Sequence, residues 1–168
     1  SLNDYVLNRA KTNAKHFFMT GDHSCGIGVW SAISNLYQKD LGLIWIDAHL
    51  DSHIPETSPS GNLHGMPVSH LLGFGDKRLT NLISNKLKPE NICFIGIRDY
   101  EDEELDFIEQ HKIKTFFMKD ITKKNIDHVF KEACEHVSKN TYKFGVSLDI
   151  DSFDPTEAPG TGCYNPGG

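Results

Sequence analysis

Three polar residues directly behind an apolar run are the feature that most constrains how this chain folds. Residues 41–46 form the apolar run, and Asp47, His49 and Asp51 follow at alternate positions. In an extended segment, side chains alternate between two faces, so these three are expected to point the same way. Carboxylate oxygens with an imidazole suit Mn²⁺, Fe²⁺ or Zn²⁺ better than Ca²⁺. The pattern therefore predicts a buried strand that ends in metal ligands.

A second apolar run, near the end of the sequence, is also followed directly by acidic residues at alternate positions. Residues 146–148 lead directly into Asp149 and Asp151. Because ligands bind at the carboxyl ends of strands in open α/β sheets, we expect these carboxylates to meet Asp47 there. Asp47 and Asp149 would then bridge two metal ions, which would share a water and convert it into a hydroxide nucleophile.

A further candidate ligand, His23, follows the apolar run at residues 16–19, which we expect to be a strand. Taken alone, this segment equally suits a helix N-terminus, with Asp22 or Ser24 capping and His23 exposed. An isolated Asp-x-Asp is likewise often a turn. Polar ligands buried without partners would each cost on the order of several kcal/mol. Taken together, the three elements favour a metal centre over these structural alternatives.

Apolar runs and helical patterns alternate along the chain. Strands are expected at residues 16–19, 42–46, 91–96, 115–118 and 144–148. Helices are expected at residues 24–38, 66–72, 103–111 and 124–138. The strands are short and apolar throughout, which predicts burial on both faces. We therefore predict an α/β fold, a three-layer α-β-α arrangement with a parallel sheet and the metal site at the carboxyl ends of its strands.

The length of 168 residues suits a single α/β domain over residues 1–168 with a substantial core. The Gly- and Pro-rich segment 154–168 ends in what looks like the middle of a loop. A compact fold seldom ends on such a sequence, so we expect this domain to be truncated at its C-terminus.

Charge and composition exclude several classes of partner. The net charge is −6 and no basic cluster is present, which argues against nucleic-acid binding. No apolar stretch approaches the roughly 18 residues that a membrane span requires, and no signal peptide is evident at the start of the sequence. The four cysteines are scattered without a C-x-x-C pair, which fits a reducing, cytoplasmic setting.

Three motifs resemble those of the ureohydrolase family, which comprises arginases, agmatinases, formimidoylglutamases and their relatives. They are Gly-Asp-His-Ser at residues 21–24, Asp-Ala-His-Leu-Asp at residues 47–51 and Ser-Leu-Asp-Ile-Asp-Ser-Phe-Asp-Pro at residues 147–155. The third continues into Ala-Pro-Gly-Thr-Gly at residues 158–162. A fourth segment, residues 60–67, is more similar to arginases than to agmatinases.

The resemblance implies a binuclear manganese centre with two Mn²⁺ ions per subunit. One ion would be held by His23, Asp47, Asp51 and Asp149. The other would be held by Asp47, His49, Asp149 and Asp151. The bridging hydroxide would attack the guanidinium carbon, and the intermediate would collapse to urea and an amine. The ligands alone would also admit iron, cobalt or zinc.

Catalytic and substrate-binding roles also follow from the resemblance. His64 would be the proton shuttle for the leaving amine, and imidazole ordinarily titrates near neutral pH. Asp51 would also orient the hydroxide. The candidate substrate-binding residues are His53, Ser58, Ser60, Asn62, Glu101 and Glu104. Glu101 stands where the family has Asp, and His53 where arginases have Asn. The acidic segment 99–106 equally suits a helix N-terminus matched to the helix dipole.

The expected activity is manganese-dependent hydrolysis of L-arginine to L-ornithine and urea. Agmatinase, guanidinobutyrase or formimidoylglutamase activity is the alternative within the enzyme class, and a catalytically silent metal-binding protein is the alternative outside it. The expected partner is a small guanidino substrate, with no nucleic acid and no membrane. A homo-oligomer, trimeric or hexameric, is expected by family analogy.

Overall fold

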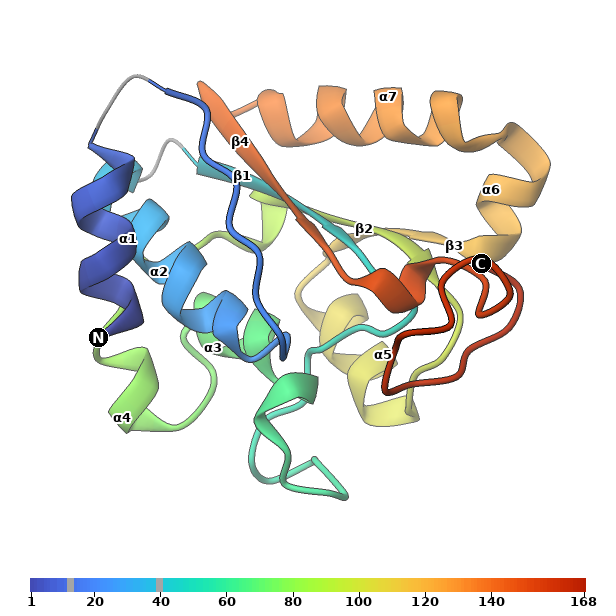
Figure 1. The fold of residues 1–168 in the computed structure, drawn as a ribbon, viewed down its shortest axis with the longest axis horizontal. Helices are drawn as coiled ribbons and strands as arrows, with labels where there is room; N and C mark the ends of the chain where they lie inside the picture. Colours follow the sequence, from blue (N-terminus) through green and yellow to red (C-terminus); the bar gives the residue numbers. More distant parts are fainter. Residues whose placement is uncertain (12–13, 39–40) are drawn as a thin grey trace. The chain divides into compact units, whose positions relative to one another are not determined.

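The computed structural model describes residues 1–11, 14–38 and 41–168 (Figure 1). The chain divides into two compact units, and each is described by itself. The first unit comprises Ser1–Leu41 and Asp51–Lys88, and the second comprises Gly42–Leu50 and Pro89–Gly168. In the described part of the chain, no helix has the length and apolar character needed to cross a membrane.

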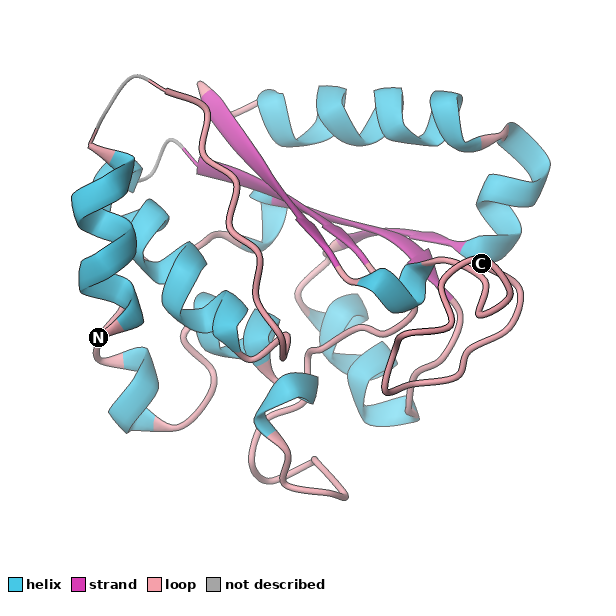
Figure 2. Ribbon diagram, viewed as in Figure 1, coloured by secondary structure: helices cyan, strands magenta, loops and turns pink. Residues whose placement is uncertain are grey.

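The second unit contains a four-stranded parallel sheet in the order β3-β2-β1-β4 (Figure 2). Its strands are β1 (Leu41–Ile46), β2 (Ile92–Ile97), β3 (Lys114–Phe117) and β4 (Lys143–Leu148). Leu43 of β1 pairs with Ile92, and Cys93 of β2 pairs with Lys114. The sheet is flanked by helices, which confirms the predicted α/β class.

Helix α7 (Ile126–Ser138) packs against this sheet. Its buried residues Val129, Ala133 and Val137 recur at every fourth position, which places them on one helix face. They form a core cluster with Ile44, Cys93, Ile95 and Phe116. The close approach depends on Gly42, because a Cβ there would lie 2.8 Å from the carbonyl oxygen of Val137. The unit also contains η3 (Pro89–Asn91), α5 (Asp102–Gln110), α6 (Met118–Lys124) and η4 (Ile150–Ser152).

The first unit is helical. Its elements are α1 (Leu2–Ala10), α2 (Cys25–Tyr37), η2 (Leu63–Gly65), α3 (Pro67–Leu72) and α4 (Lys77–Thr80). Helix α2 packs against both α1 and α3. Ser1 begins α1 with a capping box that involves Asp4, and Asp76 caps α4 by accepting from the backbone N–H of Arg78. Gly73 ends α3 in the left-handed conformation, with φ of 93°.

The expected helices at residues 24–38, 66–72 and 103–111 are confirmed as α2, α3 and α5. The expected helix at residues 124–138 is α7, which begins after Asn125 with φ of 65°. Three helices were not predicted, namely α1, α4 and α6. The expectation of one domain over residues 1–168 stays a prediction.

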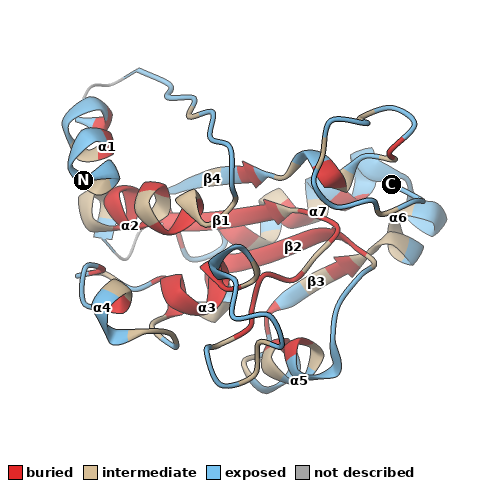
Figure 3. Ribbon diagram, turned by 60° about the horizontal axis from the view of Figure 1, so that its bottom comes forward, coloured by how far each residue is buried: buried red, intermediate tan, exposed pale blue. Residues whose placement is uncertain are grey.

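Two expectations about strands are wrong. Residues 16–19 lie in a loop, with Phe17 and Met19 86% and 83% exposed. A short apolar run becomes a strand only where a neighbouring strand pairs with it, and the described residues give this run no such pairing. Burial on both faces holds for β1 and β2 but not for β3, where Lys114 is exposed, or for β4, where Phe144, Val146 and Leu148 are exposed. Figure 3 shows the exposure of β4. Strands β3 and β4 are the two edges of the described sheet, so their side chains have fewer neighbours.

Candidate metal centre

The turn after β1 and the turn after β4 are held side by side by backbone hydrogen bonds. The N–H of Asp47 donates to Ile95 of β2 at 3.1 Å, and the N–H of Asp149 donates to Ile46 of β1 at 2.9 Å. Gly96 allows β2 to approach, because it has φ of 95° and a Cβ there would lie 3.1 Å from the carbonyl oxygen of Asp47. The carboxyl ends of these strands therefore bring the polar turns together, as the sequence predicted.

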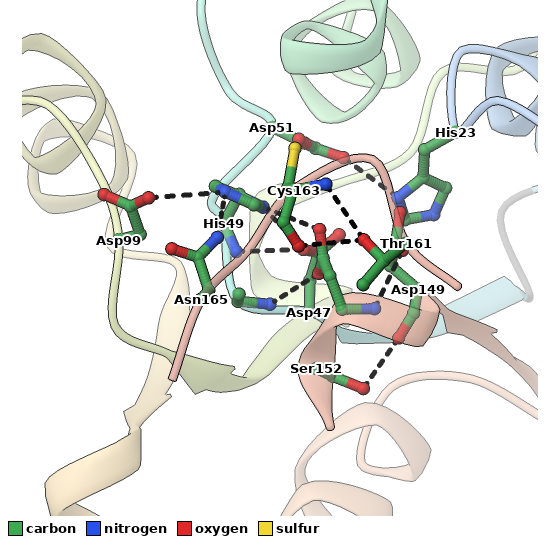
Figure 4. Close-up of polar contacts among 12 residues, drawn as sticks. His23, Asp47, His49, Asp51, Asp99, Asp149, Ser152, Thr161, Cys163 and Asn165 are labelled. Atoms are coloured by element: carbon green, nitrogen blue, oxygen red, sulfur yellow. Dashed lines mark hydrogen bonds and ion pairs between the residues drawn. The ribbon is translucent and has the colours of Figure 1, made fainter. Parts of the chain in front are cut away.

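Three carboxylates converge at this edge of the sheet. Asp47, Asp149 and Asp151 each offer an oxygen, and these oxygens lie within 4.8 Å of one another. Asp47 and Asp149 are labelled in Figure 4. Asp47 is 1% exposed and Asp151 is 5% exposed. Asp149 begins η4 and accepts a hydrogen bond from the N–H of Asp151 at 3.2 Å. Buried carboxylates this close repel one another unless a cation lies among them.

His49 supplies the imidazole of this group. Its Nδ1 lies 3.2 Å from Asp151 and 3.3 Å from Asp47. Burial alone would lower the pKa of His49, but the two carboxylates outweigh it and raise the pKa to about 11. Burial, together with the charges of Asp47 and Asp149, raises the pKa of Asp151 against the lowering effect of His49.

These four side chains fit a divalent cation. One imidazole cannot neutralise three carboxylates, so the group carries an excess of negative charge even when His49 is protonated. Oxygen ligands with one imidazole suit manganese, iron, cobalt or zinc. A cation that binds His49 displaces its proton, because only the neutral imidazole is a ligand. Asp47, His49, Asp149 and Asp151 are therefore together, as the sequence predicted, although their role as ligands stays a prediction.

The second ring nitrogen of His49, Nε2, also has polar contacts. It lies 2.8 Å from the amide nitrogen of Asn165 and 3.5 Å from a carboxylate oxygen of Asp99. This leaves Nδ1 directed at Asp47 and Asp151. A metal-binding histidine usually donates its other ring N–H, and of these two contacts Asp99 is the one that can accept it, whereas Asn165 restrains the position of the ring. The sequence did not identify Asn165 in this role.

The two remaining candidate ligands form a pair within the first unit. Nδ1 of His23 lies 3.1 Å from Asp51, and both side chains are largely buried. Neither expected cap is seen at α2: Asp22 accepts from the N–H of Ser24 at 2.9 Å, before the helix begins, and the N-cap residue Ser24 makes no side-chain capping hydrogen bond. His23 and Asp51 lie buried against each other. The alternative of an exposed His23 is therefore wrong, and so is its expected position at a strand end, since residues 16–19 form no strand.

The expectation of an extended backbone through all three ligands after β1 is also wrong. Asp51 has φ of 49°, in the left-handed region that Asp tolerates better than most residues. Its carbonyl oxygen accepts from the N–H of Val68 at 2.9 Å, which ties it to α3. Asp51 therefore reaches its position through a turn rather than through strand alternation.

His64 lies in η2 with half of its side chain exposed. Its Nδ1 is 3.6 Å from a carboxylate oxygen of Asp22. Both residues belong to the first unit, and the exposure leaves the imidazole accessible. The role of His64 as a proton shuttle stays a prediction.

The candidate substrate-binding residues of the first unit lie along residues 53–62. The hydroxyls of Ser58 and Ser60 accept from the N–H groups of Gly61 and Asn62 at 3.1 Å and 3.2 Å, so they shape the loop. Asn62 is exposed. His53 is buried, and its Nδ1 lies 3.0 Å from the hydroxyl of Thr57.

The acidic candidates of the second unit differ in environment. Glu104 is 3% exposed and accepts from the N–H of Glu101 at 3.4 Å, as part of the capping box that begins α5. Glu101 is exposed. Glu104 therefore fits the helix N-terminus interpretation, whereas Glu101 is accessible to a ligand.

Arg98 holds the loop that carries the later ligands, a role that the sequence did not reveal. Its guanidinium donates to the carbonyl oxygens of Asp151 and Asn165, each at 2.8 Å. It also donates to Ser152 at 3.2 Å and to Pro166 at 3.3 Å. A side chain that binds several backbone carbonyls fixes the path of a segment without regular structure.

Replacing Arg98 with glutamine is expected to lower the free energy of unfolding by about 2–4 kcal/mol, because several carbonyl groups lose charged donors. Chemical denaturation would measure this change. Arg78→Gln is the matched control, since Arg78 is exposed and its ion pair with Asp76 is local. That variant should lose less than about 1 kcal/mol. Equal losses in the two variants would contradict the role assigned to Arg98.

Cys163 is the other residue that the sequence did not identify. The sequence predicted scattered cysteines without metal-ligand spacing, yet the sulfur of Cys163 lies beside His49 and Asp151. Burial and the neighbouring carboxylates raise the pKa of this thiol, while His49 acts in the opposite direction. The only signal in the sequence was its place directly after the third motif.

Comparison with known proteins gives a consistent result. A family model described as Arginase family matches residues 1–168. Arginase from Staphylococcus aureus strain MRSA252 is 49% identical over 168 residues, which are 99% of this chain and 55% of that protein. Arginase from Bacillus caldovelox is 41% identical over 150 residues, covering 88% of this chain and 50% of that protein. The chain thus spans about half the length of these curated relatives.

Solved structures show the same likeness. The crystal structure of arginase from Bacillus cereus has a TM-score of 0.94 at 38% identity and covers 99% of this chain and 58% of that chain. A formimidoylglutamase structure from Bacillus subtilis has a TM-score of 0.80 at 22% identity, which shows a shared fold only.

Proposed function

Because the chain belongs to the arginase family, we propose that the full-length protein is a manganese-dependent ureohydrolase that converts L-arginine to L-ornithine and urea. The observation that carries the proposal is the convergence of Asp47, Asp149 and Asp151 within 4.8 Å, with His49 against two of them. The names of the similar proteins support arginine as the substrate.

The proposal assigns a separate role to each group of side chains. Asp47, His49, Asp149 and Asp151 would hold a divalent cation in the second unit, and the His23–Asp51 pair would bind metal in the first. Bound ions would supply a hydroxide nucleophile at neutral pH, which the poorly electrophilic guanidinium group requires. Asn165 and Asp99 keep Nδ1 of His49 directed at the carboxylates. Glu101, which is exposed, would meet the α-amino group of the substrate.

Urea release from L-arginine by the full-length protein preincubated with Mn²⁺ tests the proposal directly. We expect urea from arginine and none from agmatine, with activity lost on chelation and restored by Mn²⁺. Urea from agmatine but not from arginine would assign the protein as an agmatinase instead of an arginase. Formamide from formiminoglutamate would identify a formimidoylglutamase, and urea from guanidinobutyrate a guanidinobutyrase. No product from any of the four substrates would contradict enzymatic function.

A further inference from the structure

Cys163 brings a sulfur atom to the group of carboxylates described above. Its Sγ, a ring nitrogen of His49 and an oxygen of Asp151 lie within 4.8 Å of one another. Cys163 and His49 are labelled in Figure 4. Asp151 is 95% buried, and it also belongs to the group formed with Asp47 and Asp149. The thiol therefore adjoins a set of nitrogen and oxygen donors that already fits a cation.

The backbone around Cys163 is fixed on both sides. On the N-terminal side, the hydroxyl of Thr161 accepts from the N–H of Cys163 at 3.0 Å and donates to its carbonyl oxygen at 2.9 Å. On the C-terminal side, Asn165 contacts His49 and its carbonyl oxygen accepts from Arg98. These contacts join the Cys163 loop to the candidate ligands themselves, so the thiol is placed by the same structure that orients His49.

We propose that Cys163 binds, as a thiolate, the cation held by His49 and Asp151, and that it raises the affinity of this position for Co²⁺ and Zn²⁺ relative to Mn²⁺. Thiolate ligands favour zinc and cobalt, whereas oxygen-rich sites suit manganese. When the sulfur–metal bond forms, the thiol proton is released to solvent and no electrons are transferred. The inference deepens the proposed function, since it concerns the same metal centre.

Cobalt gives the proposal a spectroscopic test that does not depend on turnover. The full-length protein loaded with Co²⁺ is expected to show a thiolate-to-cobalt charge-transfer band in the near ultraviolet. Cys163→Ser and Cys163→Thr should remove the band. Cys134→Ser should keep it, because Cys134 lies on α7 and only adjoins the apolar core cluster. Circular dichroism would establish that each variant is folded.

Competition titrations would measure the metal preference. Cys163→Ser is expected to weaken Co²⁺ and Zn²⁺ binding by at least about tenfold, a loss typical of a ligand or its supporting shell, and to change Mn²⁺ binding by less than about twofold. Stoichiometric Co²⁺ without the band, or a band that survives in both Cys163 variants, would overturn the proposal.

The urea assay and the cobalt spectrum together distinguish a failure of this inference from a failure of the proposed function. Urea release by the Mn²⁺-loaded protein, with no charge-transfer band in the Co²⁺-loaded protein, would overturn the ligand role of Cys163 alone. A band that requires Cys163, in a protein that releases no urea, would support the ligand role and contradict the proposed hydrolysis.

Discussion

Replacing Asp149 with asparagine is expected to lower kcat for urea release by at least about a thousandfold, equivalent to roughly 4 kcal/mol of transition-state stabilisation. The side chain of Asp149 accepts from the N–H of Asp151 and lies in the carboxylate group with Asp47. Asparagine keeps an oxygen to accept that hydrogen bond, so η4 should still form. What it removes is a negative charge that a divalent cation requires. Metal analysis would measure the loss of bound metal, and a urea assay on the same sample would measure the loss of kcat.

Asp154→Asn is the matched control for Asp149→Asn. The side chain of Asp154 also accepts from the N–H two residues later, that of Thr156, at 2.9 Å. Hydrogen bonds from Thr156 and from the backbone of Gly167 lower the pKa of Asp154 to about 2, so it is charged at neutral pH. Its neutralisation should leave metal content unchanged and kcat within about twofold. Full metal content and activity in Asp149→Asn would remove Asp149 from the proposed ligand set.

The sequence predicted the grouping of Asp47, His49, Asp149 and Asp151 because the position of each strand, and of the polar residues that follow it, is encoded locally. An apolar run marks each strand, and polar residues at its carboxyl end must share an edge with those of the neighbouring parallel strand. The geometry around Asp51 was not predictable in this way. Its positive φ occurs together with a hydrogen bond from Val68, which is a contact between residues distant in the sequence that no local pattern predicts.

The contributions of Arg98, Asn165 and Cys163 could not be predicted from periodicity for a related reason. Arg98 acts on backbone carbonyl groups, which every residue possesses, so its targets leave no pattern in the sequence. Asn165 and Cys163 lie in a Gly- and Pro-rich loop without helical or strand period. The strand predicted at residues 16–19 shows the opposite error, in which a local pattern was present but the structure was not. An apolar run alone does not supply a strand to pair with.

His64→Asn is expected to lower kcat about a hundredfold while changing KM by less than about threefold. The amine that leaves the guanidino carbon must gain a proton. Asparagine occupies similar space and can hydrogen-bond, but it cannot transfer a proton at neutral pH. The half-exposed imidazole of His64 lies 3.6 Å from Asp22, whose carboxylate can orient the ring. Steady-state kinetics with L-arginine, with and without added imidazole, would measure the effect.

His128→Asn provides the comparison that isolates proton transfer from the loss of an imidazole. Nε2 of His128 lies 3.1 Å from Glu132, so it repeats the histidine–carboxylate pairing on the surface of α7. That variant should keep full kcat. Added imidazole should restore part of kcat in His64→Asn, because a free base can enter where the side chain was lost. Wild-type kcat in His64→Asn would contradict the shuttle, whereas a low kcat that imidazole does not restore would indicate that His64 supports the local structure instead.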